Sequence, residues 1–228
     1  MSEVPAHVGY ILDGNRRWAK QHGLPTYEGH LAGYNALHDV IEASSDAGVK
    51  FISLYTFSTQ NWSRAEDEVQ GILKLIRRMF KGDIKRLTKK GYKVVVLGSR
   101  EGIPDDLVKL IAEAEEFSKN ANKAVVAICF NYGGQEEIVR AARRLVDQGV
   151  GVEDVTMESF AGALDHPEVP PCDLIVRTSG EQRLSDFMLW RAAYSEFIFL
   201  DKYWPEMTKE DVTSILEEYT RRSRRFGG

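Results

Sequence analysis

The chain has 228 residues, enough for one large domain with a substantial buried core. Its 43% hydrophobic and 28% charged residues are ordinary for a soluble protein, and a net charge of −4 gives no basic field that would attract nucleic acid. No signal peptide is visible, and no apolar run approaches the length that crosses a bilayer. Cys129 and Cys172 lack metal-binding spacing, and Cys129 lies inside an apolar run, so we expect a reducing, cytoplasmic compartment. From the net charge we expect no nucleic-acid partner.

Apolar runs rich in Val, Ile, Leu and Phe alternate with helical patterns along the chain. In order, we predict a strand at 8–12, a helix with apolar residues from Leu31 to Ile41, a strand at 51–57, a helix over 69–80, a strand at 93–97, a helix at 105–119, a strand at 124–130, a helix at 136–147, strands at 174–177 and 197–200, and a helix at 209–222. Near-continuous apolar strands are typical of a sheet covered on both faces. The alternation predicts a single α/β domain, residues 1–228, with a mainly parallel sheet of about six strands flanked by helices.

The segment from Asp13 to Trp18 directly follows the first predicted strand and reads Asp-Gly-Asn-Arg-Arg-Trp. Ligands bind beyond the carboxyl ends of parallel strands. An acid in this place can hold a metal ion, Gly14 lets the backbone approach a ligand, and amides at a helix start attract phosphate together with arginines. The alternative is an Asp/Asn turn and helix cap with a solvated basic face.

Arginines also follow the second and fifth predicted strands. Arg177 and Arg183 flank a Thr-Ser-Gly turn, whose hydroxyls and amides would add donors to an anion-binding nest. Guanidinium groups bind phosphate oxygens bidentately and stay charged. Together with Arg17 and Arg64, these side chains favour an anion site at one edge of the sheet over a set of separate, solvated surface residues.

A second carboxylate and a histidine are further chemical candidates. Glu196 lies directly before the last apolar run, where a magnesium ion bridging it to a diphosphate and an ion pair with an arginine are both reasonable partners. His30 opens a helix, where a cap or packing role competes with proton donation to a leaving group. The chain has no GxxxxGK[ST] or GxGxxG motif, and residues 105–109 lack the third aspartate of DDxxD, which argues against nucleotide hydrolysis and dinucleotide binding.

Eight segments, taken in order, resemble the cis-prenyltransferases, the undecaprenyl diphosphate synthase-like family. They are DGNRRWAK at 13–20, GHLAG at 29–33, YTFSTQNWSR at 55–64, NYGG at 131–134, RTSGEQRLSDF at 177–187, AAYSEF at 192–197, WP at 204–205 and RRFGG at 224–228. Each segment alone is weak, whereas eight in order over nearly the whole chain are specific. The resemblance implies that isopentenyl diphosphate condenses with an allylic prenyl diphosphate to give a polyprenyl diphosphate with new cis double bonds, with Mg²⁺ as cofactor.

The resemblance also implies roles for individual residues. Asp13 matches a magnesium ligand and essential acid, and Glu196 matches a second carboxylate near the metal; His30 and Asn61 are the further catalytic candidates. The residues that match the allylic diphosphate site are Gly14, Asn15, Arg17 and His30. The residues that match the isopentenyl diphosphate site are Arg177, Arg183 and Ser185. Asn61 and Arg64 match a mobile loop that positions the reacting groups, and Glu68 matches an acid further along that loop. Further substrate-binding candidates in the same segments are Arg16, Trp18, Ser58 and Trp62. The helix over 69–80 and the strand faces would line a tunnel for the growing chain.

The basic tail also gains a meaning from the resemblance. Alone, Arg225-Phe226-Gly227 reads as a solvated chain end. In the family, an Arg-x-Gly ending crosses the dimer interface and helps to bind diphosphate in the partner subunit. We therefore expect a homodimer whose sites each borrow an arginine. We also expect transient contact with a membrane surface during release of the greasy product.

Several positions depart from the family pattern. Thr26 stands where an arginine for the allylic diphosphate is usual, and Ala65 replaces a usual proline. Ser179 replaces a usual glycine, and Asp186 a usual asparagine. Thr56, Cys129 and Phe130 lie on strands expected to flank the tunnel, where bulk would shorten the product.

Two rival functions remain at this point. One is a same-fold synthase that couples allylic diphosphates irregularly into a short branched or cyclic product, a possibility that the Thr26 departure leaves open. The other is a non-catalytic partner subunit. It is disfavoured because such subunits typically lack the metal aspartate and phosphate arginines, which this chain retains as Asp13, Arg177 and Arg183.

Overall fold

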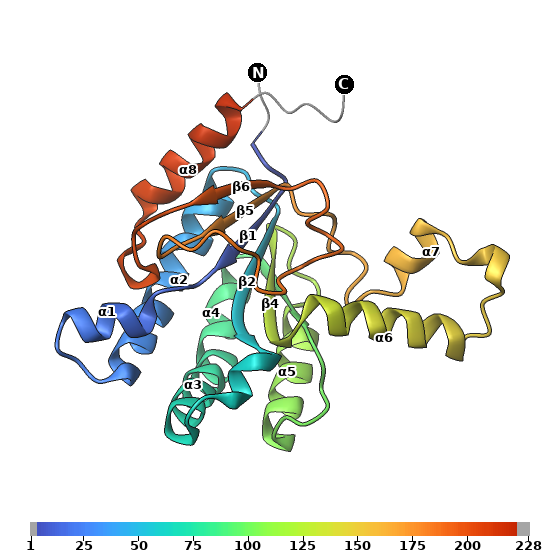
Figure 1. Ribbon diagram of the computed structural model, residues 1–228, viewed down its shortest axis with the longest axis horizontal. Coiled ribbons are helices and arrows are strands. Elements are labelled where there is room, and N and C mark those ends of the chain that lie inside the picture. The colour runs from blue at the N-terminus through green and yellow to red at the C-terminus, as the bar shows by residue number, and fades with distance from the viewer. Residues whose placement is uncertain (1–3, 223–228) are drawn as a thin grey trace.

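The computed structural model describes residues 4–222, and its centre is a sheet of six parallel strands in the order β3-β4-β2-β1-β5-β6 (Figure 1). The strands are β1 His7–Ile11, β2 Phe51–Ser58, β3 Tyr92–Leu97, β4 Ala124–Tyr132, β5 Leu174–Arg177 and β6 Glu196–Phe199. Each matches a predicted strand to within two residues at either end. The predicted α/β architecture with a parallel sheet is confirmed.

Helices cover the sheet and occupy the crossovers between its strands. They are α1 Asn15–Gln21, α2 Thr26–Asp46, α3 Glu66–Arg78, α4 Ile84–Lys89, α5 Asp105–Ser118, α6 Gly134–Asp147, α7 Met157–Gly162 and α8 Lys209–Arg221. Thr208 caps α8 by accepting a hydrogen bond from the backbone N–H of Asp211, as its type and position predict. None of the described helices combines the length and hydrophobicity needed to cross a bilayer.

Both faces of the sheet are buried, which explains the uninterrupted apolar runs. Val94 and Val96 of β3 point to one face, where they join the large core formed with α2, α3, α4, α5 and α8. Val95 and Leu97 point to the other face, which is covered by the segment around Phe187. Beyond that segment, α6 and α7 extend away from the sheet as an arm, drawn in yellow in Figure 1.

The helix predicted over 69–80 is longer and less regular than expected. It begins at Glu66, passes through one π-helical turn at Met79–Asp83, and continues as α4 to Lys89. The strongly amphipathic start of this helix was readable from its apolar spacing. The π-turn was not, because Ile76, Phe80 and Ile84 continue the four-residue apolar spacing of an α-helix through it.

Candidate active site

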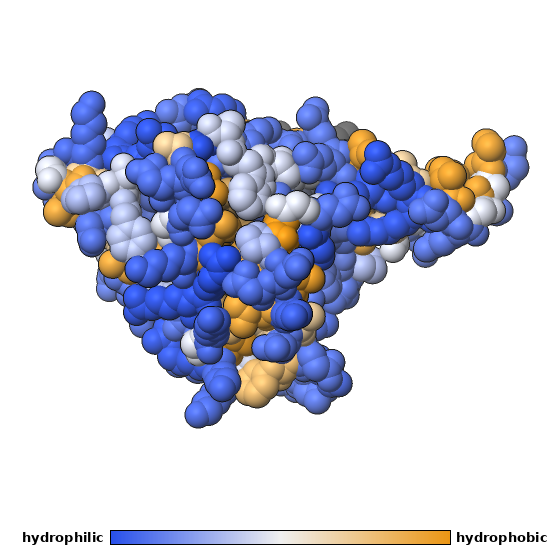
Figure 2. Space-filling model, turned by 90° about the horizontal axis from the view of Figure 1, so that it is seen from below, coloured by the Kyte–Doolittle hydropathy of each residue, from blue (hydrophilic) through white to orange (hydrophobic). Residues whose placement is uncertain are grey.

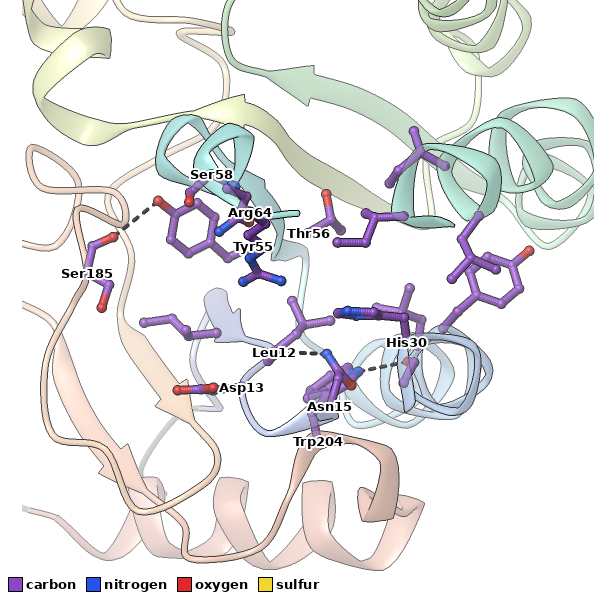
Figure 3. A pocket seen from close by; sticks show the side chains of 18 of the residues that line it. Leu12, Asp13, Asn15, His30, Tyr55, Thr56, Ser58, Arg64, Ser185 and Trp204 are labelled. Carbon is purple, nitrogen blue, oxygen red and sulfur yellow. Dashed lines mark hydrogen bonds between the residues drawn. The ribbon is translucent and has the colours of Figure 1, made fainter. Parts of the chain in front are cut away.

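Two adjoining cavities open at the carboxyl edge of the sheet. The first has a volume of about 340 Å³ and runs from the ends of β1, β2 and β5 into the space between α2 and α3. The second has a volume of about 740 Å³ and lies over α1 and the start of α2. Both are lined by Leu12, Asp13, Asn15, His30 and Arg64. Figure 3 shows that Asp13, Asn15, His30 and Arg64 come from different elements and surround one space.

Asp13 stands at the junction of the cavities and is held in place from three sides. Its Oδ2 accepts a hydrogen bond from Arg177 Nη2 at 2.9 Å, and its Oδ1 accepts one from the backbone N–H of Gly14 at 2.7 Å. Arg17 Nη2 lies 3.4 Å from Oδ1. The backbone is fixed as well, because Asp13 N–H donates to Thr178 Oγ1. The carboxylate therefore faces the cavity in a fixed orientation.

Arg177 is almost completely buried at the end of β5 and organises the side of the site opposite α1. Its guanidinium also donates to Ser185 Oγ at 2.8 Å and to the carbonyl oxygen of Arg183. Its Nε is buried and has no hydrogen-bond partner in the described part of the chain. Arg177, Arg183 and Ser185 all line the first cavity, as the sequence predicted.

Gly14 allows the tight approach between β1 and α1. Its φ of +102° lies in the left-handed region, and a Cβ there would stand 2.7 Å from Tyr203 Cδ1 and 2.9 Å from Ser179 Oγ. Asn15 then donates to the carbonyl oxygen of Leu12, while its Oδ1 is buried without a partner among the described residues. The first residues of α1 are thus packed tightly against the mouth of both cavities.

Glu68 connects the loop after β2 to the helices on the far side of the mouth. Its side chain is 9% exposed, and its Oε1 accepts hydrogen bonds from Arg64 at 2.8 Å and from His30 Nε2 at 3.2 Å. Arg16 Nε lies 3.8 Å from Oε2. Burial lowers the pKa of His30 below its usual value, although Glu68 opposes this shift. Three of the predicted substrate-binding residues therefore meet on one carboxylate.

The predicted positioning loop forms a short 3-10 helix, Thr59–Ser63, at the end of β2. Asn61 Oδ1 accepts the backbone N–H of Ser58 at 3.0 Å, and both residues line the first cavity. Trp62 turns the other way, where its indole N–H donates to Asn131 Oδ1 at 2.8 Å and its ring packs edge-on against Phe57. Trp62 therefore anchors the loop instead of lining the cavity.

The inner part of the first cavity is apolar. Its walls are provided by Tyr34 and Leu37 of α2 and by Ile72, Leu75, Ile76 and Met79 of α3 and the π-turn. Thr56 also lines it, as expected. Cys129 and Phe130 do not line it, because both are fully buried in β4. A polar mouth followed by an apolar interior suits a substrate with an anionic head and a hydrocarbon tail.

The departures from the family pattern have distinct structural settings. Thr26 opens α2 and lines the second cavity. Ser179 has a φ of +81°, a left-handed conformation that favours glycine, and its hydroxyl is buried without a partner among the described residues. Asp186 accepts the backbone N–H of Gln135 at 2.8 Å in the first turn of α6, where a negative charge is favourable.

Besides Trp62 and Glu68, two more of the predicted site residues line neither cavity. Glu196 is the first residue of β6 and pairs in register with Leu174, at the amino edge of the sheet, and its carboxylate accepts from Arg222 at 3.1 Å. Within one chain, Glu196 and Asp13 therefore cannot hold the same ion, and the prediction is corrected on that point. Trp18 stacks on His22 with ring centroids 4.3 Å apart and lines neither cavity. Arg225 lies outside the described residues.

The residues around Asp13 fit a magnesium ion that is held by a single protein carboxylate together with substrate phosphates and water. No group of three or more His, Cys, Asp or Glu side chains suited to a metal occurs within residues 4–222. Mg²⁺ is commonly bound through one or two carboxylates, with substrate phosphates and water completing its shell. A single fixed carboxylate in a cavity lined by arginines matches that arrangement.

Sequence reasoning missed two polar contributors. Lys20 lines the second cavity, and its position one turn after Arg16 on the same helix was the available signal. Glu181 bridges the two halves of the site, because it accepts from Arg17 at 3.0 Å and from Arg183 at 2.5 Å. Nothing in its local sequence distinguished it from an ordinary exposed acid.

Comparisons with known proteins agree with this architecture. The Prenyltransf family model, described as undecaprenyl diphosphate synthase, matches residues 11–227. Isoprenyl transferase 2 of Bradyrhizobium diazoefficiens is 42% identical, with 100% of this chain and 92% of that protein covered. A trans,polycis-polyprenyl diphosphate synthase, (2Z,6E)-farnesyl diphosphate specific, of Thermobifida fusca is 42% identical over 99% of this chain and 81% of its own length.

Two solved structures have the same fold. The crystal structure of lavandulyl diphosphate synthase from Lavandula x intermedia, in complex with dimethylallyl diphosphate, has a TM-score of 0.93 at 32% identity and covers 99% of both chains. A probable undecaprenyl diphosphate synthase from Campylobacter jejuni has a TM-score of 0.85 at 28% identity and covers 100% of both. The chain therefore belongs to the undecaprenyl diphosphate synthase family, the cis-prenyltransferases.

Proposed function

We propose that the protein condenses isopentenyl diphosphate with an allylic prenyl diphosphate, in the presence of Mg²⁺, and extends the product by cis isoprene units. The observation that carries the proposal is the position of Asp13. It lies where an arginine-lined cavity over α1 meets an apolar cavity between α2 and α3. An allylic diphosphate bound across this junction has its head among cations and its tail among apolar side chains.

The residues divide the chemical work between two anionic substrates. Arg16, Arg17 and Lys20 surround the second cavity and bind the allylic diphosphate. Arg177 and Arg183, on the opposite side of Asp13, bind isopentenyl diphosphate. Holding both substrates at one junction brings the terminal alkene carbon next to the allylic carbon and removes the entropic cost of their encounter.

Asp13 is the proposed Mg²⁺ ligand. The ion, when bound, stabilises the charge that develops on the departing diphosphate. Arg177 and the backbone N–H of Gly14 keep the Asp13 carboxylate turned toward the cavity before either substrate arrives. The new carbon–carbon bond forms as the allylic C–O bond breaks, and loss of a proton leaves the cis double bond.

A homodimer is part of the proposal. β6 is an edge strand on which the rings of Phe197 and Phe199 stack with centroids 6.0 Å apart, and Phe199 is 37% exposed. The α6–α7 arm projects at the right of Figure 2 with exposed apolar side chains, including Val152 and Met157. Large exposed apolar residues on a projecting arm support contact with a second copy. The Arg225 tail would then reach the partner's diphosphate site.

Chain elongation is preferred to irregular coupling because of the relatives' names. The relatives named isoprenyl transferase and polyprenyl diphosphate synthase are each 42% identical to this chain over nearly its whole length. The test uses purified protein, Mg²⁺ and labelled isopentenyl diphosphate, with dimethylallyl, geranyl, farnesyl or geranylgeranyl diphosphate as primer. Longer products with new cis double bonds are expected. Failure to incorporate isopentenyl diphosphate with any primer would refute the proposal, and products formed from dimethylallyl diphosphate alone would assign irregular coupling instead.

A further inference from the structure

The first cavity has a defined far end. From His30 at the mouth, α2 runs two turns, about 10 Å, to Leu37, the last residue along α2 that lines the cavity. From Ile72, α3 runs a similar distance to Met79 in the π-turn. A hydrocarbon tail that grows away from Asp13 therefore meets Leu37 and Met79 last.

A polar contact joins α2 to the π-turn beside these apolar residues. The hydroxyl of Tyr34 on α2 donates a hydrogen bond to Asp83 Oδ2 at the end of the π-turn. His38 Nε2, one turn further along α2, lies 3.7 Å from the same oxygen. The Tyr34 side chain lines the cavity, and the guanidinium of Arg78 lies 5.3 Å from its ring centroid. The contact thus ties α2 to the π-turn, and both elements contribute walls to the apolar part of the cavity.

The hydroxyl of Tyr34 is the main donor to Asp83 at neutral pH. Burial lowers the pKa of His38 below its usual value near 6.5, and Arg86 lowers it further, so the imidazole is neutral at pH 7. Burial also raises the pKa of Asp83, although its side chain remains 20% exposed. Tyr34, in contrast, is buried, and its hydroxyl depends on Asp83 for its hydrogen bond.

We propose that the Tyr34–Asp83 hydrogen bond closes the far end of the cavity and so limits the number of five-carbon units in the product. The inference rests on the proposed function. A chain tip that moves past Leu37 and Met79 has to separate α2 from the π-turn. It would break this hydrogen bond and leave the buried hydroxyl of Tyr34 facing hydrocarbon without its acceptor, which is costly. Growth stops where that cost exceeds the gain from burying another isoprene unit.

Two variants test the hydrogen bond separately from the bulk of the wall. Tyr34→Phe keeps the ring and removes the donor, and Asp83→Leu replaces the acceptor with an apolar side chain of similar size. Both are expected to make products at least one five-carbon unit longer than the wild type. The double variant should match Asp83→Leu, because either change alone removes the same bond. Products are dephosphorylated and separated by chain length.

Tyr10→Phe is the matched control. The Tyr10 hydroxyl also bonds to α2, through Ser44 Oγ at 2.8 Å, but Tyr10 does not line the cavity. Its loss should lower stability and leave product lengths unchanged. Lys81→Ala, an exposed change within the π-turn, should change neither stability nor product length.

The readout separates closure of the cavity from stability and from the proposed function. Variants that react more slowly but give wild-type lengths would overturn the inference and leave the contact a purely structural role. Unchanged lengths at unchanged rates would overturn it as well. If the wild type itself incorporates no isopentenyl diphosphate, the proposed function fails, whereas equal lengths from active proteins contradict only the closure.

Discussion

Arg177 Nη2 lies 2.9 Å from Asp13 Oδ2, and this contact joins the ends of two neighbouring strands. Arg177 ends β5 and pairs in register with Ile11, the last residue of β1. Parallel pairing therefore brings an arginine and an aspartate, 164 positions apart in sequence, to one point of the carboxyl edge. The buried guanidinium fixes the carboxylate, and the same guanidinium reaches Ser185 on the isopentenyl side.

Asp13→Asn should nearly abolish turnover and leave the fold intact. Asparagine can still accept the hydrogen bond from Gly14 N–H. It lacks the negative charge that holds a magnesium ion and pairs with Arg177. We expect kcat to fall by about 10²–10³-fold or more, as for loss of a principal electrostatic group. Steady-state kinetics and circular dichroism check both parts. Asp39→Asn, on the exposed side of α2, should keep wild-type activity, and an active Asp13→Asn enzyme would remove the proposed role.

Arg177→Lys should raise KM for isopentenyl diphosphate by about tenfold or more and lower kcat as well. Lysine keeps the charge, but one ammonium group cannot serve Asp13, Ser185 and a diphosphate together as a planar guanidinium does. Arg77→Lys is the control, because Arg77 makes the same fork-like contact with Asp106 on the surface, at 2.6 and 3.1 Å. Equal kinetics for both variants would show that Arg177 has no special part in binding.

Ser179→Gly should raise the free energy of unfolding by about 1 kcal/mol. The left-handed conformation costs a residue with a side chain about 1–2 kcal/mol in the folded state. The greater conformational freedom of glycine in the unfolded chain offsets only part of the gain from removing that cost. Loss of the unpaired buried hydroxyl adds to the gain. Chemical denaturation gives the number. Ser45→Gly, near the end of α2, should instead be destabilising because helix interiors disfavour glycine, and a loss of stability at both sites would contradict the conformational argument.

The sheet was predictable because its strands are covered on both faces and so read as continuous apolar runs. The polar turns after β1, β2 and β5 then identified the functional edge. The direction of β6 separates Glu196 from Asp13 within one chain, since an acid that precedes a parallel strand lies at the opposite edge from one that follows it. The resemblance alone did not supply that distinction.

Other parts of the site depend on contacts that local sequence does not encode. Glu68 meets Arg16 and His30 only because α3 packs beside α1 and α2, whereas its contact with Arg64, four residues earlier, is local. The Tyr34–Asp83 contact depends on the π-turn, which adds a residue without changing the apolar pattern. Long-range polar partners of this kind are specified by tertiary packing and not by spacing along the chain.

Acidification should destabilise the protein through His7. The side chain is fully buried, with Nε2 2.7 Å from Ser53 Oγ and Nδ1 2.9 Å from the carbonyl oxygen of Pro170. Burial lowers its pKa from 6.5 to about 4. Because the unfolded chain binds the proton more readily, the stabilisation is complete above pH 6.5 and is lost as the pH falls toward 4.

The size of this effect follows from the shift. Between pH 7 and pH 4.5, His7 should account for a loss of about 2–3 kcal/mol in the free energy of unfolding. His7→Gln should show a correspondingly flatter dependence on pH in denaturant titrations, while His22→Gln, at an exposed position, should keep the wild-type slope. Identical slopes for all three proteins would mean that His7 is protonated equally in both states.

Mixing two inactive proteins tests whether the Arg225 tail completes the partner's site. In a hybrid of Asp13→Ala and Arg225→Ala subunits, one site keeps its own Asp13 and borrows an intact Arg225. After full exchange of equal amounts, half of the dimers are hybrids with one complete site each, so roughly a quarter of wild-type activity should return. Asp13→Ala mixed with Arg177→Ala is the control, because both changes affect a subunit's own site and no hybrid site is complete. Rescue in the control, or none in the test after confirmed exchange, would refute the shared site.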